Sequence, residues 1–361
     1  MNLKEAYNEH FVKKLADQIV RHQSSFKKDI FIKSILNKEW KHKELKERMR
    51  HISLTIHQCL PIPYPEQIQV LNEVVSSYNG LQGMVFPDFV EVFGQEDYQT
   101  SIKALEDYTQ YSTSEFAIRP FIQKYPDSTI QQLIKWSKHS NHHVRRLASE
   151  GSRPKLPWSF PLREFIKDPS PVLPILENLK NDESEYVRKS VANHLNDISK
   201  SQPELALKLG AKWHGKSKHL DRVVKHGLRT LLKKGDKRAL QIFKLDDSTN
   251  LLIPEINITH QEINIGGDLY FEFEVINNSK KSRNIRLEYQ IAYVKSNGTT
   301  SPKIFQISET ELKVNSAKKW TKKQSFINRT TRKHYPGEHR ISIVVNGDEK
   351  CSTTFKVLSD K

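Results

Sequence analysis

From Leu3 to about Leu245, apolar residues recur at the three- and four-residue intervals that are typical of amphipathic helices. Polar and charged residues fill the positions between them. The first two apolar stripes are formed by Leu3, Tyr7, Phe11, Leu15 and Ile19, and then by Phe31, Ile32, Ile35 and Leu36. The pattern predicts a series of helices that each bury one face and expose the other.

Two of these helices repeat each other. The run V-R-R-L-A-S-E-G from Val144 aligns with V-R-K-S-V-A-N-H-L from Val187, an offset of 43 positions, and a weaker copy begins near Leu220. This offset falls within the ~40–47-residue period of HEAT-type helical pairs. Such repeats stack side by side, and we expect the second helix of each pair to follow one concave face. Residues from neighbouring repeats therefore come close in space.

Near Leu245 the helical pattern gives way to short segments of alternating apolar and polar residues. These segments cover residues 269–275, 285–293, 303–307, 320–326, 339–345 and 352–357, and the turn signals between them are Gly266-Gly267, Asn297-Gly298, Pro336-Gly337 and Asn346-Gly347. The fold class that we predict is an all-α HEAT-like helical-repeat solenoid over residues 1–246, followed by an all-β immunoglobulin-like sandwich over residues 251–361. Cys59 and Cys351 fall in different domains, so we expect no disulfide.

The segment from Asn141 to Trp158 combines a helix with a stiff loop. Val144, Leu147 and Ala148 form a buried stripe, and charged residues lie off it. We interpret Gly151 as a left-handed helix end, because the proline-rich run that follows it cannot continue a helix. A carboxylate therefore lies at a helix end, beside a loop that presents an indole.

This combination allows two interpretations. Carboxylates, guanidiniums and an aromatic ring in one rigid segment suit a site that holds an anionic polymer and stabilises a cationic centre. In the simpler interpretation, Arg146 and Glu150 are a solvated ion pair four residues apart, and Trp158 fills the core between repeats.

The chain is strongly basic, with 58 Lys and Arg against 42 Asp and Glu, a formal charge of +16 and a pI near 9.5. A polyanion is therefore the first partner to consider. The spacing of His51, His57 and Cys59 matches no recognised zinc pattern, so we predict no metal and no small-molecule cofactor. Without a signal peptide or a membrane-spanning run, we expect a soluble, cytoplasmic protein, and we also expect a monomer.

The run R-R-L-A-S-E-G-S-R-P-K-L-P-W resembles the signature of the AlkC branch of the AlkC/AlkD DNA alkylation-repair glycosylases. The helical region before it and the β-rich tail after it also fit the AlkC layout. The resemblance implies a DNA glycosylase of base excision repair that acts on duplex DNA without conventional base flipping. Such an enzyme hydrolyses the N-glycosidic bond of cationic alkylated bases, namely N3-methyladenine and, as a candidate second substrate, N3-methylcytosine.

The resemblance also implies site residues. Glu150 and Trp158 match the family's signature acid and tryptophan, Asp197 matches the acid on the following repeat, and Glu115 matches the acid in the preceding one. In the ordinary alternative, Glu115 is only an acid in the first turn of a helix that Ser112, Thr113 and Ser114 cap. The residues expected to hold DNA phosphates are Arg145, Arg146, Arg153, Arg188 and Lys189.

Other classes of protein remain open. The same repeats would suit a non-catalytic DNA-binding helical-repeat scaffold, in which the acids only balance neighbouring arginines, or a protein–protein adaptor. No G-x-S-x-G, H-E-x-x-H or P-loop pattern occurs in the chain, which argues against the common hydrolase and nuclease classes.

Overall fold

A computed structural model describes residues 2–245, 247–330 and 332–359. By their internal contacts these residues divide into two compact units. One holds residues up to 206 together with 215–227, and the other holds residues 207–214 together with those from 228 onward. The second unit thus combines the end of one helix and two further short helices with the strands, so its limit lies before the expected boundary near residue 250. That boundary stays a prediction.

The first helices of the chain stack in pairs. They are η1 (Leu3–Ala6), α1 (Glu9–His22), α2 (Lys28–Ile35), η2 (Lys38–His42), α3 (Leu45–Cys59), α4 (Tyr64–Val75), α5 (Gly80–Gly83), α6 (Val85–Phe93) and α7 (Tyr98–Tyr108). Tyr7 and Phe11 are buried as expected, whereas Leu3 is 53% exposed. Leu3 belongs to a separate 3-10 turn, because Asn8 caps α1 by accepting a hydrogen bond from Phe11 N at 2.9 Å.

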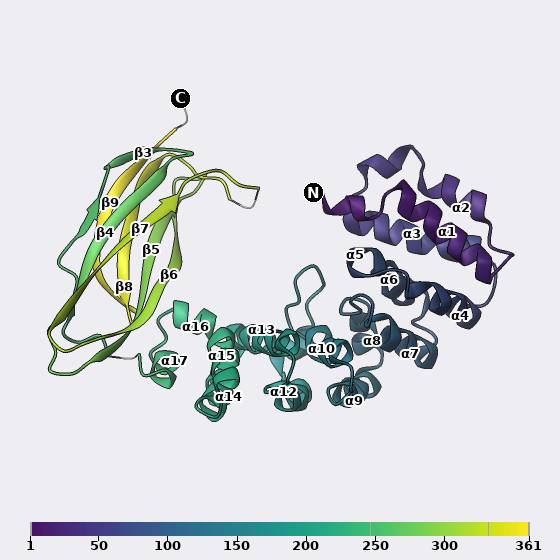
Figure 1. The fold of residues 1–361 in the computed structure, drawn as a ribbon, viewed down its shortest axis with the longest axis horizontal. Coiled ribbons are helices and arrows are strands. Elements are labelled where there is room, and N and C mark those ends of the chain that lie inside the picture. The colour runs from purple at the N-terminus through teal and green to yellow at the C-terminus, as the bar shows by residue number, and fades with distance from the viewer. Residues whose placement is uncertain (1, 246, 331, 360–361) are drawn as a thin grey trace. The chain divides into compact units, whose positions relative to one another are not determined.

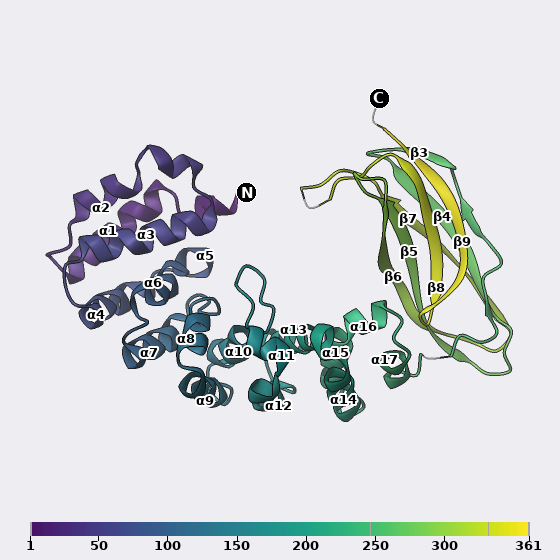
Figure 2. The same ribbon diagram turned by 180° about the vertical axis from the view of Figure 1, so that it is seen from behind.

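The repeated segments form neighbouring helices. The next elements are α8 (Ile118–Lys124), α9 (Pro126–Trp136), α10 (His142–Gly151), α11 (Arg163–Lys167), η3 (Ser170–Val172), α12 (Leu173–Leu179), α13 (Glu185–Ser201), α14 (Pro203–Trp213) and α15 (Lys218–Gly227). Helix α10 packs against α13, and α13 packs against α15, so these three helices form a row. Helices α9 and α12 pack along one side of this row (Figures 1 and 2). Val144 and Val187 are both fully buried, which confirms the predicted apolar stripes of the repeat.

Two local predictions were wrong. Gly151 is the last residue of α10 and does not have the left-handed conformation. Glycine is needed there because a Cβ atom would lie 2.5 Å from Ile118 Cγ2, so α10 could not pack as closely on α8. Helix α8 begins at Ile118 and not near Glu115, because residues 115–117 form a turn. Pro120 then lies in the first turn of α8, where a missing N–H needs no acceptor.

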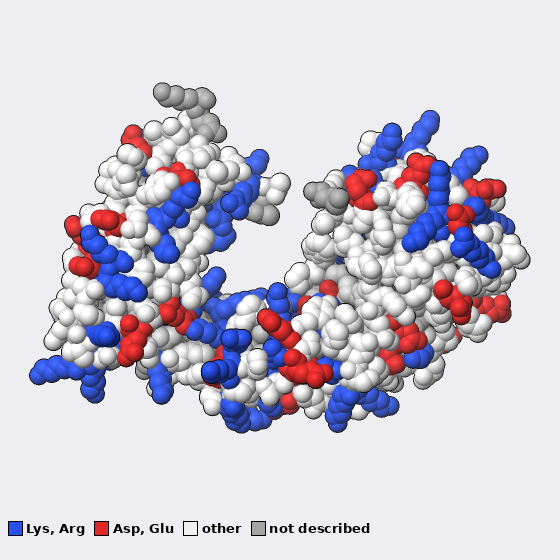
Figure 3. Space-filling view, viewed as in Figure 1, with Lys and Arg blue, Asp and Glu red and all other residues white. Residues whose placement is uncertain are grey.

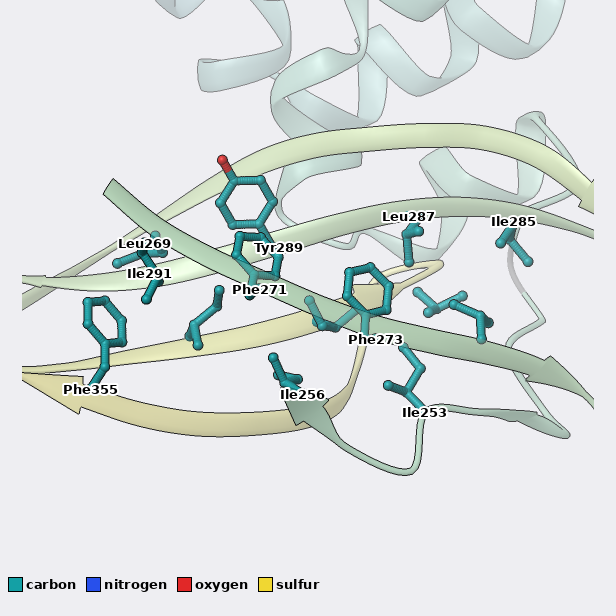
Figure 4. Packing of buried hydrophobic residues seen from close by; sticks show 14 of the residues in the cluster. Ile253, Ile256, Leu269, Phe271, Phe273, Ile285, Leu287, Tyr289, Ile291 and Phe355 are labelled. Carbon is teal, nitrogen blue, oxygen red and sulfur yellow. The ribbon is translucent and has the colours of Figure 1, made fainter. Parts of the chain in front are cut away.

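The strands form two sheets that face each other. They are β1 (Leu251–Leu252), β2 (Ile256–Ile258), β3 (Glu262–Asn264), β4 (Asp268–Asn277), β5 (Arg283–Val294), β6 (Thr300–Leu312), β7 (Ser316–Ser325), β8 (Gly337–Val345) and β9 (Asp348–Leu358). In one sheet β4 pairs with β1, β2 and β7; the other has the order β3-β9-β8-β5-β6. Phe271 and Phe273 of β4 meet Leu287 of β5 in the core between them (Figure 4).

These sheets confirm the predicted fold class of helical repeats followed by an immunoglobulin-like sandwich. Asn346 and Gly347 have positive φ angles of 51° and 81° and connect β8 to β9, as expected for a tight hairpin. Helices α16 (Arg229–Lys233) and α17 (Lys237–Ile242) lie in the same unit as the sandwich. Cys59 and Cys351 are both free thiols. Among the described helices, none is long and apolar enough to cross a membrane.

Candidate functional site

The structure brings together the three acids that the sequence singled out. Glu115 lies in the turn before α8, Glu150 in the last turn of α10 and Asp197 on α13, and their exposed fractions are only 8%, 5% and 1%. Arg146 forms ion pairs with Glu115 and, at 3.6 Å, with Glu150. Arg153 contacts Glu150 Oε1 through Nη1 at 2.6 Å and Asp197 Oδ2 through Nε at 2.9 Å. We call this series of carboxylates and guanidiniums the acid–arginine chain.

Burial makes these ion pairs different from the solvated pair that the simpler interpretation assumed. The pKa of Arg153 is raised, because the attraction of Glu150 and Asp197 outweighs the burial that disfavours its charge. The pKa of Arg146 is raised for the same reason, with Glu115 and Glu150 as its main partners. Removing one member of a buried pair leaves an uncompensated charge, which costs about 3–5 kcal/mol. The acid–arginine chain therefore fixes the position of each carboxylate.

A layer of polar side chains connects α10 to α13 beside these acids. His194 Nδ1 donates to Ser149 O at 3.0 Å, and Ser190 Oγ donates to Ser149 Oγ at 2.9 Å. Nε2 of His194 is buried and has no partner among the described residues. Burial, with a smaller opposing effect from Asp197, lowers the pKa of His194 to about 4. The imidazole is therefore neutral at pH 7, and it joins the residue before Glu150 to the helix that carries Asp197.

From the lowered pKa of His194 we expect the protein to lose stability in acid. The pKa of His194 is about 4 in the fold against an ordinary value of 6.5, so the unfolded chain binds the proton more tightly. The stabilisation is complete above pH 6.5 and is lost as the pH falls toward 4. Between pH 7.5 and 4.5 we expect this group to contribute about 2–3 kcal/mol to the loss in free energy of unfolding, measured by urea denaturation.

In the His194→Gln variant, the free energy of unfolding should fall correspondingly less as the pH is lowered, whatever the stability of the variant at pH 7.5. The exposed His10 provides the matched control, because His10→Gln should leave the decline unchanged. Parallel pH profiles for wild type and His194→Gln would show that His194 does not titrate as the structure indicates.

The loop that carries Trp158 is held at its base by a buried arginine that the sequence analysis missed. Arg119 is fully buried and donates to the carbonyl oxygens of Gly151 (3.0 Å), Arg153 (2.7 Å) and Phe160 (2.5 Å). Burial, and then repulsion from Arg153, lowers the pKa of Arg119 to about 10, so it stays charged at neutral pH. The available signal was an arginine inside the apolar run F-A-I-R-P-F-I, where a charge needs internal partners.

Trp158 projects from this loop. Its side chain is 61% exposed, so the alternative interpretation of Trp158 as core filler is wrong. Its backbone has a φ of 65°, the left-handed region that side chains rarely adopt. A cleft of about 680 Å³ lies between the loop and the N-terminal helices. Trp158, Phe160 and Phe116 line it, so the cleft connects the loop to the turn that holds Glu115.

The five basic residues expected at DNA phosphates have different surroundings. Arg145 is bound to Asp182 Oδ2 at 2.6 Å and to the backbone carbonyl of Ser140 at 2.6 Å, so its guanidinium is occupied in joining α10 to the turn before α13. Arg153 is equally occupied by the acids. Arg188 also donates to two carbonyl oxygens but is only partly buried, and Lys189 is exposed.

Arg188 and Lys189 belong to a basic surface on the repeats. They line a hollow of about 270 Å³ together with Arg222 of α15. Figure 3 shows Lys and Arg side chains gathered over the part of the ribbon that α13 and α15 occupy, with a group of acidic side chains beside them. Arg146 lies between this surface and the acids, with its guanidinium 5.0 Å from the ring centre of the half-exposed Tyr186.

Comparison with known proteins places this arrangement in a class. Residues 93–218, which hold all the acids of the acid–arginine chain, match the family model "DNA alkylation repair enzyme". Residues 253–359 match the model "Uncharacterised protein YhaZ, C-terminal Ig-like domain". The helical unit and its buried acids thus define a protein of the DNA alkylation repair class.

Individual relatives define the branch. "Uncharacterized protein YhaZ" of Bacillus subtilis (strain 168) is 45% identical over 356 residues, covering 99% of both chains. The structure of alkylpurine DNA glycosylase AlkC of Pseudomonas fluorescens, bound to DNA containing an abasic site analog, matches with a TM-score of 0.96 and 34% identity over 99% of this chain and 100% of that one. The chain belongs to the AlkC branch of the DNA alkylation repair family, which confirms the resemblance drawn from residues 145–158.

Proposed function

We propose that this protein is a DNA glycosylase of base excision repair that removes cationic alkylated bases, above all N3-methyladenine, from duplex DNA. The observation that carries the proposal is the acid–arginine chain, which fixes buried carboxylates from adjacent repeats next to a basic surface. The membership in the AlkC branch supports the same activity, because the similar Pseudomonas protein is an alkylpurine DNA glycosylase.

The chemistry of the substrate explains the choice of residues. A base alkylated at a ring nitrogen such as N3 of adenine carries a positive charge, so it leaves without being protonated by the protein. The protein must then stabilise an oxocarbenium-like deoxyribose and guide a water molecule to it, and carboxylates suit both tasks. In our proposal Asp197 and Glu150 perform them. Glu115 holds Arg146 in place at the end of the acid–arginine chain and adds negative charge to the site.

The remaining groups hold the DNA. We propose that Arg188 and Lys189 contact phosphates, which fixes the register of the duplex without reading its sequence. For Arg145, Arg146 and Arg153 we propose a structural role instead, because acids already occupy all three guanidiniums. The exposed indole of Trp158 can pack against the charged base or its sugar, a contact worth roughly 0.5–2 kcal/mol. N3-methylcytosine is a further candidate substrate, and engagement without conventional base flipping is part of the proposal.

The direct test is release of free base from duplex DNA that contains N3-methyladenine. Purified protein should release methyladenine and leave an abasic site, whereas undamaged duplex should yield no product. If the protein binds the same DNA with strong salt dependence but releases nothing, it is a non-catalytic DNA-binding scaffold, in which the acids only balance the arginines.

Trp158→Ala should lower the single-turnover rate of base release about tenfold, equivalent to ~1.4 kcal/mol in the barrier. Because the indole is largely exposed, stability should change by no more than about 0.5 kcal/mol. Tyr111→Ala, which removes an aromatic side chain that is 41% exposed, is the matched control and should retain full activity. An unchanged rate in Trp158→Ala would remove this residue from the site.

A further inference from the structure

We propose that Lys46 of α3 is a positioning residue that holds Trp158 in place for base release. Its Nζ donates to the main-chain oxygen of Trp158, which lies 112 positions later in the sequence. The same ammonium lies 4.5 Å from the ring centre of Phe116, the residue after Glu115. A single side chain from the N-terminal helices thus contacts both the loop and the turn that carry proposed site residues. This inference rests on the proposed function of Trp158.

The loop needs such a contact because its own bonds leave the tip unsupported. Arg119 holds the carbonyls of Gly151, Arg153 and Phe160, at the base of the loop. Within residues 155–159, all of them described, the backbone hydrogen bond is the 3.3 Å contact from Ser159 N to Leu156 O. Among the described residues, Lys46 is the only partner from outside the loop that bonds to this tip.

The conformation of Trp158 adds to this need. A left-handed backbone is strained for a residue other than glycine and persists only where its surroundings impose it. The exposed indole does not supply that restraint, because 61% of its surface meets solvent. Lys46 borders the hollows on both sides of Trp158, one shared with Phe116 and Phe160 and the other with Leu3 and Glu44. The hydrogen bond from Lys46 therefore restrains the tip where packing does not.

The test uses the full chain with Lys46→Met, which keeps the length of the side chain and removes the donor. The rate of base release at saturating enzyme should fall about fivefold, since small displacements of a positioned group are costly, while affinity for the DNA changes less than about twofold. Lys46→Arg, which can still donate to the carbonyl, should restore the rate. Lys43→Met is the control, because Lys43 lines the same cleft. The structure describes Lys43 and every residue of the loop, and it shows no hydrogen bond between them.

A second measurement needs no activity. Hydrogen exchange in peptides that cover residues 152–162 should become about tenfold faster in Lys46→Met without DNA and stay unchanged in Lys43→Met. Unchanged exchange would overturn the proposal, and so would weaker DNA binding with an unaltered rate at saturation, which would make Lys46 a phosphate contact. If wild type releases no base, the proposed function fails, and hydrogen exchange still decides whether Lys46 holds the loop.

Discussion

Asp197→Asn is expected to slow base release at least about a hundredfold, the loss typical when one pre-organised charged or polar group is removed from a site that stabilises developing charge. Asp197 is 1% exposed and is held on both oxygens, by Arg153 at 2.9 Å and by Lys200 at 3.1 Å. An amide has the same shape but lacks the charge that would stabilise a cationic sugar. Single-turnover release of methyladenine at saturating enzyme measures this effect separately from binding.

Asp182→Asn is the matched control for this substitution. Asp182 is also a buried carboxylate paired with an arginine, Arg145 at 2.6 Å, but it lies outside the acid–arginine chain. Both variants lose a buried ion pair and should be less stable to urea. Asp197→Asn alone should lose activity while folded, and equal activity in the two variants would assign Asp197 to the fold and not to the chemistry.

The second large effect is expected for Arg119→Met. The substitution leaves the carbonyl oxygens of Gly151, Arg153 and Phe160 without their donor. Each bond to a charged donor contributes about 1.5–3 kcal/mol, and loss of the buried charge offsets part of the total. We expect a net loss of about 3 kcal/mol in the free energy of unfolding, and base release at least tenfold slower in the folded fraction because the Trp158 loop is released at its base.

Arg48→Met separates these two effects. Arg48 is another buried arginine, and its Nη1 donates to the carbonyl oxygens of Lys4 at 3.0 Å and Tyr7 at 3.2 Å, neither of which belongs to the Trp158 loop. Loss of the Arg48 guanidinium should lower the free energy of unfolding in the same way but leave the rate of base release by the folded protein unchanged. If Arg119→Met were slow only in proportion to its unfolded fraction, the guanidinium would have no role in holding the loop for catalysis.

Periodicity predicted the elements whose burial follows a regular spacing. The stripes in α10 and α13 and the alternating strands β4 to β9 are confirmed, and so is the hairpin at Asn346 and Gly347. Strands β1 to β3 were missed, because a strand of two or three residues is too short to show alternation. Gly151 was misread because the contact that requires it, with Ile118, joins two helices and leaves no trace in local spacing.

Of the site, only the features that follow from the sequence repeat were predictable. The 43-residue offset indicated that Glu150 and Asp197 would come close, and in the structure Arg153 joins them. The burial of Glu150 was not predictable, since its position lies off the apolar stripe. Neither Lys46 nor Arg119 was singled out, because each acts on a backbone oxygen in a distant part of the chain, and no motif records such a partner.

The unusual exposure of Trp158 gives the molecule a built-in optical probe. Of its five tryptophans, Trp40, Trp136 and Trp213 are buried and Trp320 is partly buried against the sandwich core, whereas Trp158 is 61% exposed. A collisional quencher such as acrylamide reaches this indole far more readily than the buried ones. The part of the fluorescence that acrylamide removes from the unlabelled protein therefore comes mainly from the tip of one loop, and DNA that covers this loop will reduce that loss.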